Sequence, residues 1–202
     1  MTADETAAAV PGNVQKEILG PGPFLYPNPV VVVSVGTMEK ANLITIAWAG
    51  TVCAEPPCLS IAVRKTRYSF KILKETKEFV INVPNTDLLK IVDYCGCVSG
   101  SKVDKIKTTG VTLKPSQKIK TPLIVEFPLN IECRVIKEVD IGSHVLFIGE
   151  ALVTHLTKTC YNSKTKKPDP IKLNPLYYNN GFYMAGKIKM GTYGFTQGKL
   201  ST

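Results

Sequence analysis

Short hydrophobic stretches separated by turn residues run along most of the chain, and this pattern predicts a protein built mainly of β-strands. The clearest stretch is Pro29-Val30-Val31-Val32-Val33-Ser34-Val35, which is typical of a buried strand. Further strands are predicted over residues 43–48, 58–63, 78–84, 128–139 and 143–157, the last two joined at Asp140-Ile141-Gly142. Many short strands and few helices favour a closed antiparallel β-barrel, because closure also removes exposed strand edges.

The predicted helices are short and lie between strands. Ser69 is interpreted as the N-cap of one helix, with Ile72 and Leu73 on its buried side and lysines outside. Residues 87–94 predict a second amphipathic helix. Residues 99–110 are expected to form a polar loop with one helical turn, and residues 158–180 a longer loop. The tail beyond them carries Phe182, Tyr183, Tyr193 and Phe195 among glycines.

The length of 202 residues and the hydrophobic content of 44% suit one globular domain with an extension. Residues 1–20 are predicted to be a loosely held arm that ends at Gly20-Pro21-Gly22-Pro23, and residues 21–202 a single domain. No apolar run approaches the roughly 20 residues that cross a bilayer. The N-terminus also lacks the basic and apolar segments of a signal peptide. We therefore expect a cytoplasmic protein without membrane association.

Charge and cysteine content narrow the function classes only slightly. The six cysteines are interpreted as free thiols, and Cys95-Gly96-Cys97 lacks the spacing of a zinc site, so no metal is expected. The net charge of +9 permits phosphorylated ligands or nucleic acid. The densest basic patch, Lys158 with Lys164, Lys166, Lys167 and Lys172, is interpreted as a solvated loop, which makes a nucleic-acid surface the less favoured reading.

Several well-known catalytic and nucleotide-binding motifs are absent from the sequence. There is no glycine-rich dinucleotide-binding motif after a strand, no phosphate-binding P-loop and no nucleophile elbow. Only two histidines are available for Ser/His or Cys/His catalysis. These absences argue against hydrolases and against dehydrogenases with a separate nucleotide-binding domain.

The segment from residue 42 to residue 64 carries the strongest candidate chemistry. Trp48 is the only tryptophan and is followed by the small residues Ala49, Gly50 and Thr51, in a predicted tight loop where a flat ligand could approach the backbone. Regular alternation would place Asn42, Ile44, Ile46 and Trp48 on one face of the preceding strand. A redox-cofactor site and an ordinary barrel corner both fit this pattern.

Basic residues close to this segment suggest an anion site. Arg64 and Arg67 lie at the end of a predicted strand, just before the helix that Ser69 is expected to cap. Two guanidinium groups beside a helix N-terminus suit a phosphate. Lys105 could lie near a flavin ring and stabilise the negative charge of its reduced form, or it could be a surface lysine. Cys53 lies in the predicted loop, but nothing in the sequence marks it as a nucleophile.

The order of these segments resembles the flavin reductase-like, FMN-binding split-barrel family, and within it the flavoredoxin-type proteins. The resemblance spans roughly residues 23–157. It rests on residues 29–35, 41–48, 56–57, 60–64, 67–69, 78–84, 99–100, 104–105 and 142–150. It implies a mainly β, Greek-key-like split barrel with a few short helices, which forms a homodimer and binds FMN non-covalently near the subunit interface.

Carried over position by position, the resemblance also implies a set of cofactor-binding residues. The direct matches are Asn42, Trp48, Thr51, Lys105 and His144, with Phe182 as a further match, and the segments that line the ring and phosphate contain Thr45, Ala47, Cys53, Ser60, Ala62, Arg64, Arg67 and Ser69. The flavin performs the chemistry in such proteins, and Lys105 and His144 would tune it. The electron donor is then NAD(P)H or a redox protein partner. The alternative is a basic β-barrel that binds single-stranded nucleic acid or another phosphate-bearing ligand.

Overall fold

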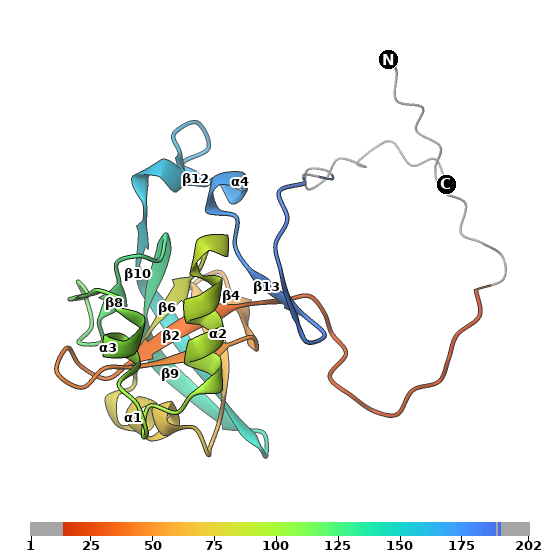
Figure 1. Ribbon diagram of the computed structural model, residues 1–202, viewed down its shortest axis with the longest axis horizontal. Coiled ribbons are helices and arrows are strands. Elements are labelled where there is room, and N and C mark those ends of the chain that lie inside the picture. Colours follow the sequence, from red (N-terminus) through yellow and green to blue (C-terminus); the bar gives the residue numbers. More distant parts are fainter. Residues whose placement is uncertain (1–13, 189, 191–202) are drawn as a thin grey trace.

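The structure is a computed structural model that describes residues 14–188 and residue 190. Its centre is a seven-stranded antiparallel sheet with the strand order β3-β2-β6-β9-β10-β5-β4 (Figure 1). The strands are β2 (Val31–Val35), β3 (Asn42–Ile46), β4 (Ala49–Cys53), β5 (Cys58–Arg64), β6 (Glu78–Val83), β9 (Leu129–Asp140) and β10 (His144–Leu156). The predicted mainly β fold is confirmed.

Strands β3 and β5 come close to one another although they are not neighbours in the strand order of the sheet. Strands β3 and β4 follow one another in the chain but lie at opposite edges of the sheet, with only Ala47 and Trp48 between them. The backbone N–H of Ala62 in β5 donates to the C=O of Trp48 at 2.9 Å, which continues the β4–β5 ladder by one residue and holds the link between β3 and β4 against β5. Within the described residues β3 pairs along its length with β2 alone, so the barrel has a seam between β3 and β5.

Two apolar clusters lie on the two sides of the sheet. The cluster inside the barrel contains Ile44, Ile46, Ile61, Val63, Phe79 and Phe147, all buried. The cluster on the outer side contains Leu43, Val92 and Phe127. Helix α2 (Leu89–Cys97) covers this outer side of β2 and β3, and α1 (Tyr68–Thr76) packs Leu73 into the inner cluster. Alternating side chains of β3 therefore contribute to both clusters.

Short elements complete the fold. They are β1 (Asn28–Pro29), η1 (Thr86–Leu88), α3 (Lys105–Thr109), β7 (Leu113–Lys114), β8 (Leu123–Ile124), η2 (Lys158–Cys160), β11 (Tyr161–Asn162), β12 (Lys167–Pro168), α4 (Pro170–Leu173), β13 (Tyr177–Asn179) and β14 (Phe182–Met184). Strand β13 pairs with β1 and with β14, so a segment late in the chain lies beside the residues that lead into the barrel.

Three predictions about local structure are wrong. The predicted tight loop after Trp48 is strand β4, because Thr51 and Val52 extend a hairpin with β5 and the turn comes later, at residues 54–57. Helix α1 begins at Tyr68 with Arg67 as its N-cap, and Ser69 lies inside the first turn. Residues 158–180 contain short helices and strands rather than a single loop.

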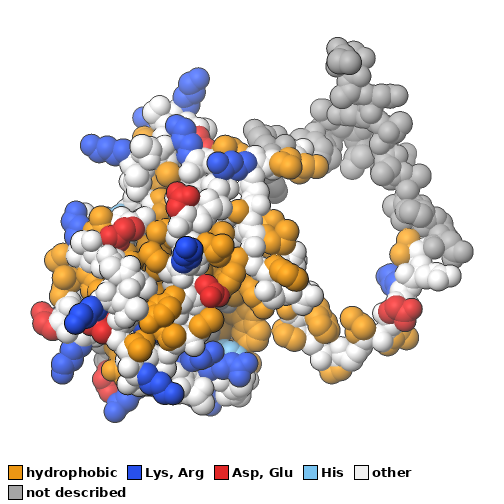
Figure 2. Space-filling model, viewed as in Figure 1, with side chains coloured by type: hydrophobic (Ala, Val, Ile, Leu, Met, Phe, Trp, Pro, Cys, Tyr) orange, Lys and Arg blue, Asp and Glu red, His pale blue; other side chains and the backbone are white. Residues whose placement is uncertain are grey.

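Residues 14–25 extend away from the barrel along an open path (Figure 1), and all of them are exposed. Hydrophobic side chains project along this segment (Figure 2), and Ile18, Leu19 and Leu25 are 97%, 70% and 84% exposed. Residues 1–13, Tyr193 and Phe195 lie outside the described residues, so the division into residues 1–20 and 21–202 stays a prediction.

Two surface properties bear on the function classes considered from the sequence. Lysine and arginine side chains are spread over the visible face in Figure 2 rather than gathered in one groove. None of the helices in the described part of the chain is long and apolar enough to cross a membrane.

Candidate functional site

Three adjoining hollows form a trough along the seam of the barrel. The middle hollow, of about 280 Å³, lies between the end of β3 and the end of β5. It shares Trp48 and Ala62 with a hollow of about 300 Å³ that reaches Gly50 and Ser60. On its other side it shares Ile44 and Arg67 with a hollow of about 150 Å³ at the start of α1. We call these three hollows the trough.

A larger hollow lies outside the trough. It has a volume of about 900 Å³ and is bounded by the β2–β3 turn, α1 and α3. Its wall mixes acidic and basic side chains, among them Glu39, Lys40, Lys71 and Glu75. It adjoins the trough only at the α1 end. Most of the residues predicted from the sequence line the trough and not this larger hollow, so the trough is the candidate site.

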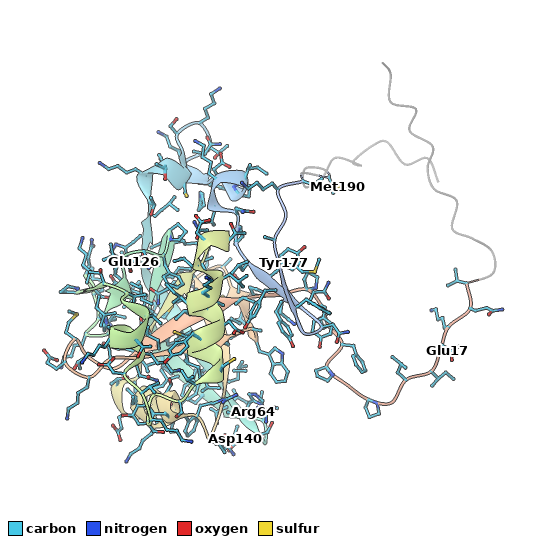
Figure 3. All side chains as sticks on the ribbon, viewed as in Figure 1. Glu17, Arg64, Glu126, Asp140, Tyr177 and Met190 are labelled. Carbon is cyan, nitrogen blue, oxygen red and sulfur yellow. The ribbon has the colours of Figure 1, made fainter. Side chains whose placement is uncertain are left out.

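The α1 end of the trough is positively charged. Arg64 and Arg67 line the middle hollow, and both are exposed. Neither makes an ion pair with a carboxylate among residues 14–188, whereas Lys65 between them is paired with Asp140 at 2.6 Å. Figure 3 shows Arg64 at the end of the barrel near Asp140. The first turn of α1, which leaves backbone N–H groups without helical partners, begins directly after Arg67. This end therefore suits an anion such as a phosphate.

Aromatic side chains surround the middle of the trough. The rings of Trp48 and His144 lie 4.7 Å apart at an angle of 42°. Tyr26 and Tyr178 line the same hollow, with ring centroids 6.1 Å apart. Trp48 is 42% exposed, so an aromatic surface is open to solvent where most tryptophans would be covered. A flat aromatic ligand could lie here against Trp48.

The free edge of β3 supplies backbone hydrogen-bonding groups to the trough. The C=O of Leu43 accepts from Lys105 Nζ at 2.7 Å, which shows that Leu43 turns its backbone groups away from the neighbouring strand β2. Because backbone groups alternate in direction along an antiparallel strand, those of Thr45 and Ala47 also face the seam. Both residues line the middle hollow. A heterocycle with several hydrogen-bonding atoms would find donors and acceptors along this edge.

The side chains of Thr45 and Lys105 make hydrogen bonds within the fold, and the predicted role of Lys105 towards a flavin stays a prediction. Thr45 turns its hydroxyl to the other side of the sheet, where Oγ1 donates to the C=O of Val92 in α2 at 2.5 Å, so only its backbone faces the trough. Lys105 is 4% exposed, and its Nζ donates to the C=O of Leu43 and of Cys95, both at 2.7 Å. Burial lowers the pKa of Lys105. The ammonium joins α3 to β3 and α2 and lies at the α1 end of the trough, away from Trp48.

The other predicted residues divide into two groups. The trough brings together Asn42, Ala47, Trp48, Ser60, Ala62, Arg64, Arg67, Ser69 and His144. Within this group Asn42 Nδ2 donates to Ser69 Oγ at 2.6 Å, which explains why Ser69 is buried in the helix instead of capping it. The second group, Thr51, Cys53 and Phe182, lines none of the three hollows. Thr51 and Cys53 are exposed on β4, and Phe182 is 70% exposed on β14.

Sequence reasoning missed Tyr26 and Tyr178. Tyr26 precedes the first matched motif, and Tyr178 lies in the segment that was expected to be a loop. The pairing of Asn28 with Tyr178 across β1 and β13 brings them to the trough. The pair Tyr177-Tyr178 was the available signal, but its placement depends on a contact between distant segments.

His144 has an unusual electrostatic environment. It begins β10 directly opposite Arg64, and Ser143 Oγ lies 2.8 Å from its Nδ1. Partial burial lowers the pKa of His144, and the positive charges of Arg64 and Arg67 lower it further. The imidazole is therefore neutral at physiological pH.

Among the described residues no group of three or more His, Cys, Asp and Glu side chains could hold a metal ion.

We expect the pKa of His144 to lie below its ordinary value of 6.5, and to rise when Arg64 is replaced by methionine. The folded state holds this proton more weakly than the unfolded chain does. The contribution of His144 to stability is therefore lost as the pH falls through 6.5 towards the folded pKa. The chain has only two histidines, so an NMR titration can assign the signal with a His144→Gln variant. Lys65→Met is the control, and an equal rise in that variant would contradict the assignment to Arg64.

Comparisons with known proteins agree with this architecture. The family model described as the flavin reductase like domain matches residues 24–187. An uncharacterized protein of Archaeoglobus fulgidus is 40% identical over 143 residues, which cover 70% of this chain and 80% of the relative.

Two solved structures are similar over nearly the whole chain. The flavoredoxin of Desulfovibrio vulgaris (Miyazaki F) has a TM-score of 0.84 and 29% identity, and the similarity covers 92% of this chain and all of that protein. The flavoredoxin of Methanosarcina acetivorans has a TM-score of 0.83 and 31% identity, with 92% and 98% covered. The chain belongs to the flavin reductase-like family, and this membership supports a flavin-binding oxidoreductase function.

Proposed function

We propose that this protein binds FMN non-covalently in the trough and transfers electrons between a donor and an acceptor through the flavin. The observation that carries the proposal is the continuity of the trough. Two arginines without carboxylate partners in residues 14–188 lie at its α1 end, and the exposed Trp48 lies beside the free backbone edge of β3 at its middle. A ligand that carries both a phosphate and a flat heterocycle needs a cationic end and an aromatic, hydrogen-bonding middle in one continuous site.

The residues of the trough fit the two ends of FMN. Arg64, Arg67 and the first turn of α1 would hold the phosphate. Trp48 would pack against the ring, and the backbone of Thr45 and Ala47 would serve its hydrogen-bonding atoms. When bound, FMN supplies the capacity to accept and release one or two electrons.

His144 would contribute position rather than charge. Its imidazole is held neutral by burial and by the two arginines, and the Ser143 hydroxyl fixes its ring through Nδ1. Contact with Trp48 then keeps the indole in place at the edge of the trough. These residues would border one side of the site without adding a further cation.

The first test is cofactor binding. The purified protein should be yellow, or should take up FMN with quenching of flavin fluorescence. Trp48→Ala should weaken FMN binding by about 2- to 12-fold, because stacking contributes roughly 0.5–1.5 kcal/mol beyond area burial. Trp48→Phe is the matched control and should retain most of the affinity. A colourless protein that binds neither FMN nor FAD would contradict the proposed function.

The electron donor is tested separately. FMN-loaded protein is mixed anaerobically with NADH and, in a second experiment, with NADPH. We propose NAD(P)H as the donor, since Trp48 is 42% exposed and a nicotinamide could reach a flavin held beside it from solvent. Rapid bleaching of the flavin absorbance is the expected result. No bleaching with either nucleotide would reject NAD(P)H and favour a redox protein as donor.

We also propose that two copies of the chain form a dimer. The exposed apolar side chains of Ile18, Leu19, Phe24 and Leu25 lie on a segment that makes few contacts with its own barrel (Figure 1). Leu25 also borders the trough, so a second copy on this segment would cover part of the site. Light scattering should give the mass of two chains, and Leu19→Asp with Leu25→Asp should shift it towards one. A monomeric wild type would contradict this proposal.

A further inference from the structure

Two cysteines lie directly opposite one another in the hairpin of β4 and β5. Cys53 and Cys58 are register partners, next to an irregularity that follows Thr51. Directly opposed residues of antiparallel strands have Cα atoms about 4.5–5.5 Å apart. A disulfide requires a Cα separation of about 4.4–6.8 Å. The backbone geometry of this pair is therefore suitable for a disulfide bond, although both cysteines are free thiols.

The two thiols differ in access to solvent. Cys53 is exposed, and its Sγ lies 3.4 Å from the C=O of Glu55. Cys58 is 4% exposed. Burial raises the pKa of the Cys58 thiol, and the neighbouring Cys53 raises it further. An outside reagent would meet Cys53 first, and Cys58 would be the only thiol opposite it in the hairpin.

The other four cysteines lack this arrangement. Burial raises the pKa of Cys95 to about 11 and that of Cys133 to about 12, which leaves both thiols unreactive. Cys160 is buried as well. Cys97 is exposed, but Cys95 is two residues away on the same helix and points in a different direction. Cys97 therefore provides an exposed cysteine without an opposed partner, which is useful as an internal control.

The pair also lies next to the trough. Gly50 and Ser60 are register partners in the same hairpin and line one of the three hollows. Cys58 is two residues from Ser60, so both side chains project from the same face of β5, about 7 Å apart along the strand. Within the described residues, strand β4 lies at an edge of the seven-stranded sheet and pairs there with β5. A bond between the two cysteines would fasten this edge beside the trough.

We propose that Cys53 and Cys58 form a thiol–disulfide exchange site that small-molecule disulfides oxidise to an intramolecular disulfide. The Cys53 thiolate attacks one sulfur of the small disulfide and releases one thiolate. Cys58 then loses its proton and attacks Cys53 Sγ, which releases the second thiolate. The two cysteines lose two electrons and two protons in total, and the small disulfide is reduced to two thiols. This proposal does not depend on the bound cofactor.

The experiment uses the full chain, reduced and then treated anaerobically with glutathione disulfide. The reaction is quenched with acid, free thiols are alkylated, and tryptic peptides are weighed. Trypsin cleaves after Lys40 and after Arg64, so residues 41–64 form one peptide, and this peptide contains both cysteines. We expect this peptide to appear unalkylated and lighter by two hydrogen atoms. Cys58→Ser should stop at a glutathione adduct on Cys53, and Cys97→Ser should react like the wild type.

Three outcomes would overturn the proposal. The first is a wild-type peptide that remains fully alkylated after treatment that adds glutathione to Cys97. The second is a stable glutathione adduct on Cys53 in the wild type, which would show that Cys58 does not reach it. The third is a disulfide that involves Cys97. The peptides of the wild-type protein decide between these results, so the test stands even if Cys58→Ser does not fold.

Discussion

Replacement of Arg64 or Arg67 by methionine should lower FMN affinity by about 10- to 100-fold. A charge-assisted hydrogen bond contributes roughly 1.5–3 kcal/mol, and each 1.4 kcal/mol is a factor of ten in affinity. The two guanidinium groups have no carboxylate partners within residues 14–188, so their full charge is available to an anion. Their removal should also reduce the dependence of affinity on salt concentration. Fluorescence titration of each variant with FMN measures the loss.

Two controls separate phosphate recognition from general damage. Lys65→Met removes one positive charge from the same turn. Because Lys65 is already paired with Asp140, this substitution should change FMN affinity little. Riboflavin has the ring of FMN without its phosphate, so its affinity should be the same in the wild type and in both arginine variants. A parallel loss of riboflavin affinity would show that the arginines act on the ring or on the fold, and would reject the phosphate role.

Lys105→Met should lower the free energy of unfolding by about 2–4 kcal/mol. Methionine keeps the length of the side chain but leaves the C=O groups of Leu43 and Cys95 without their donor, and an unsatisfied buried polar group costs about 1–3 kcal/mol. Relief of the burial of an ammonium group offsets part of this loss. Urea unfolding of the cofactor-free protein measures the change.

The matched control for this variant is Lys107→Met, which removes an exposed lysine from the same short helix. Its stability should stay within about 0.5 kcal/mol of the wild type, as for most surface substitutions. A Lys105→Met protein with wild-type stability but a changed reduction potential of its bound flavin would support the role first expected from the sequence, near the ring, and would contradict the structural role.

Local sequence pattern predicted most of the strands and part of the site. The run from Val31 to Val35 forms an interior strand of the sheet, between β3 and β6, and its side chains are buried on both faces. Arg64 and Trp48 were found because they end or follow recognisable strands. The directions of the Thr45 and Lys105 side chains were harder to predict. Both donate hydrogen bonds to backbone C=O groups of α2, and the position of α2 depends on tertiary packing.

The errors share a physical cause. Regular alternation would have placed Trp48 on one face with Ile44 and Ile46, but β3 ends at Ile46, so Trp48 reaches the same hollow from the link to β4 and not from the strand. Ser69 has the residue type of an N-cap, yet its hydroxyl accepts from Asn42, which is distant in sequence. Tyr178 reaches the trough through pairing with Asn28. The position of each of these three residues depends on a contact between distant segments, and hydrophobic periodicity and local propensity carry no information about such contacts.

The seam also constrains the order in which the chain can fold. Strand β5 forms its hairpin with β4 from local contacts, but its other neighbour, β10, lies far along the sequence. Closure of the barrel must therefore await the second half of the chain, and such long-range pairing is slow because loop closure costs entropy before contacts repay it. Residues of the trough come from both halves, since His144 and Tyr178 join Trp48 and Arg64. A ligand of the trough can bind only after closure, and its uptake would report the last stage of folding.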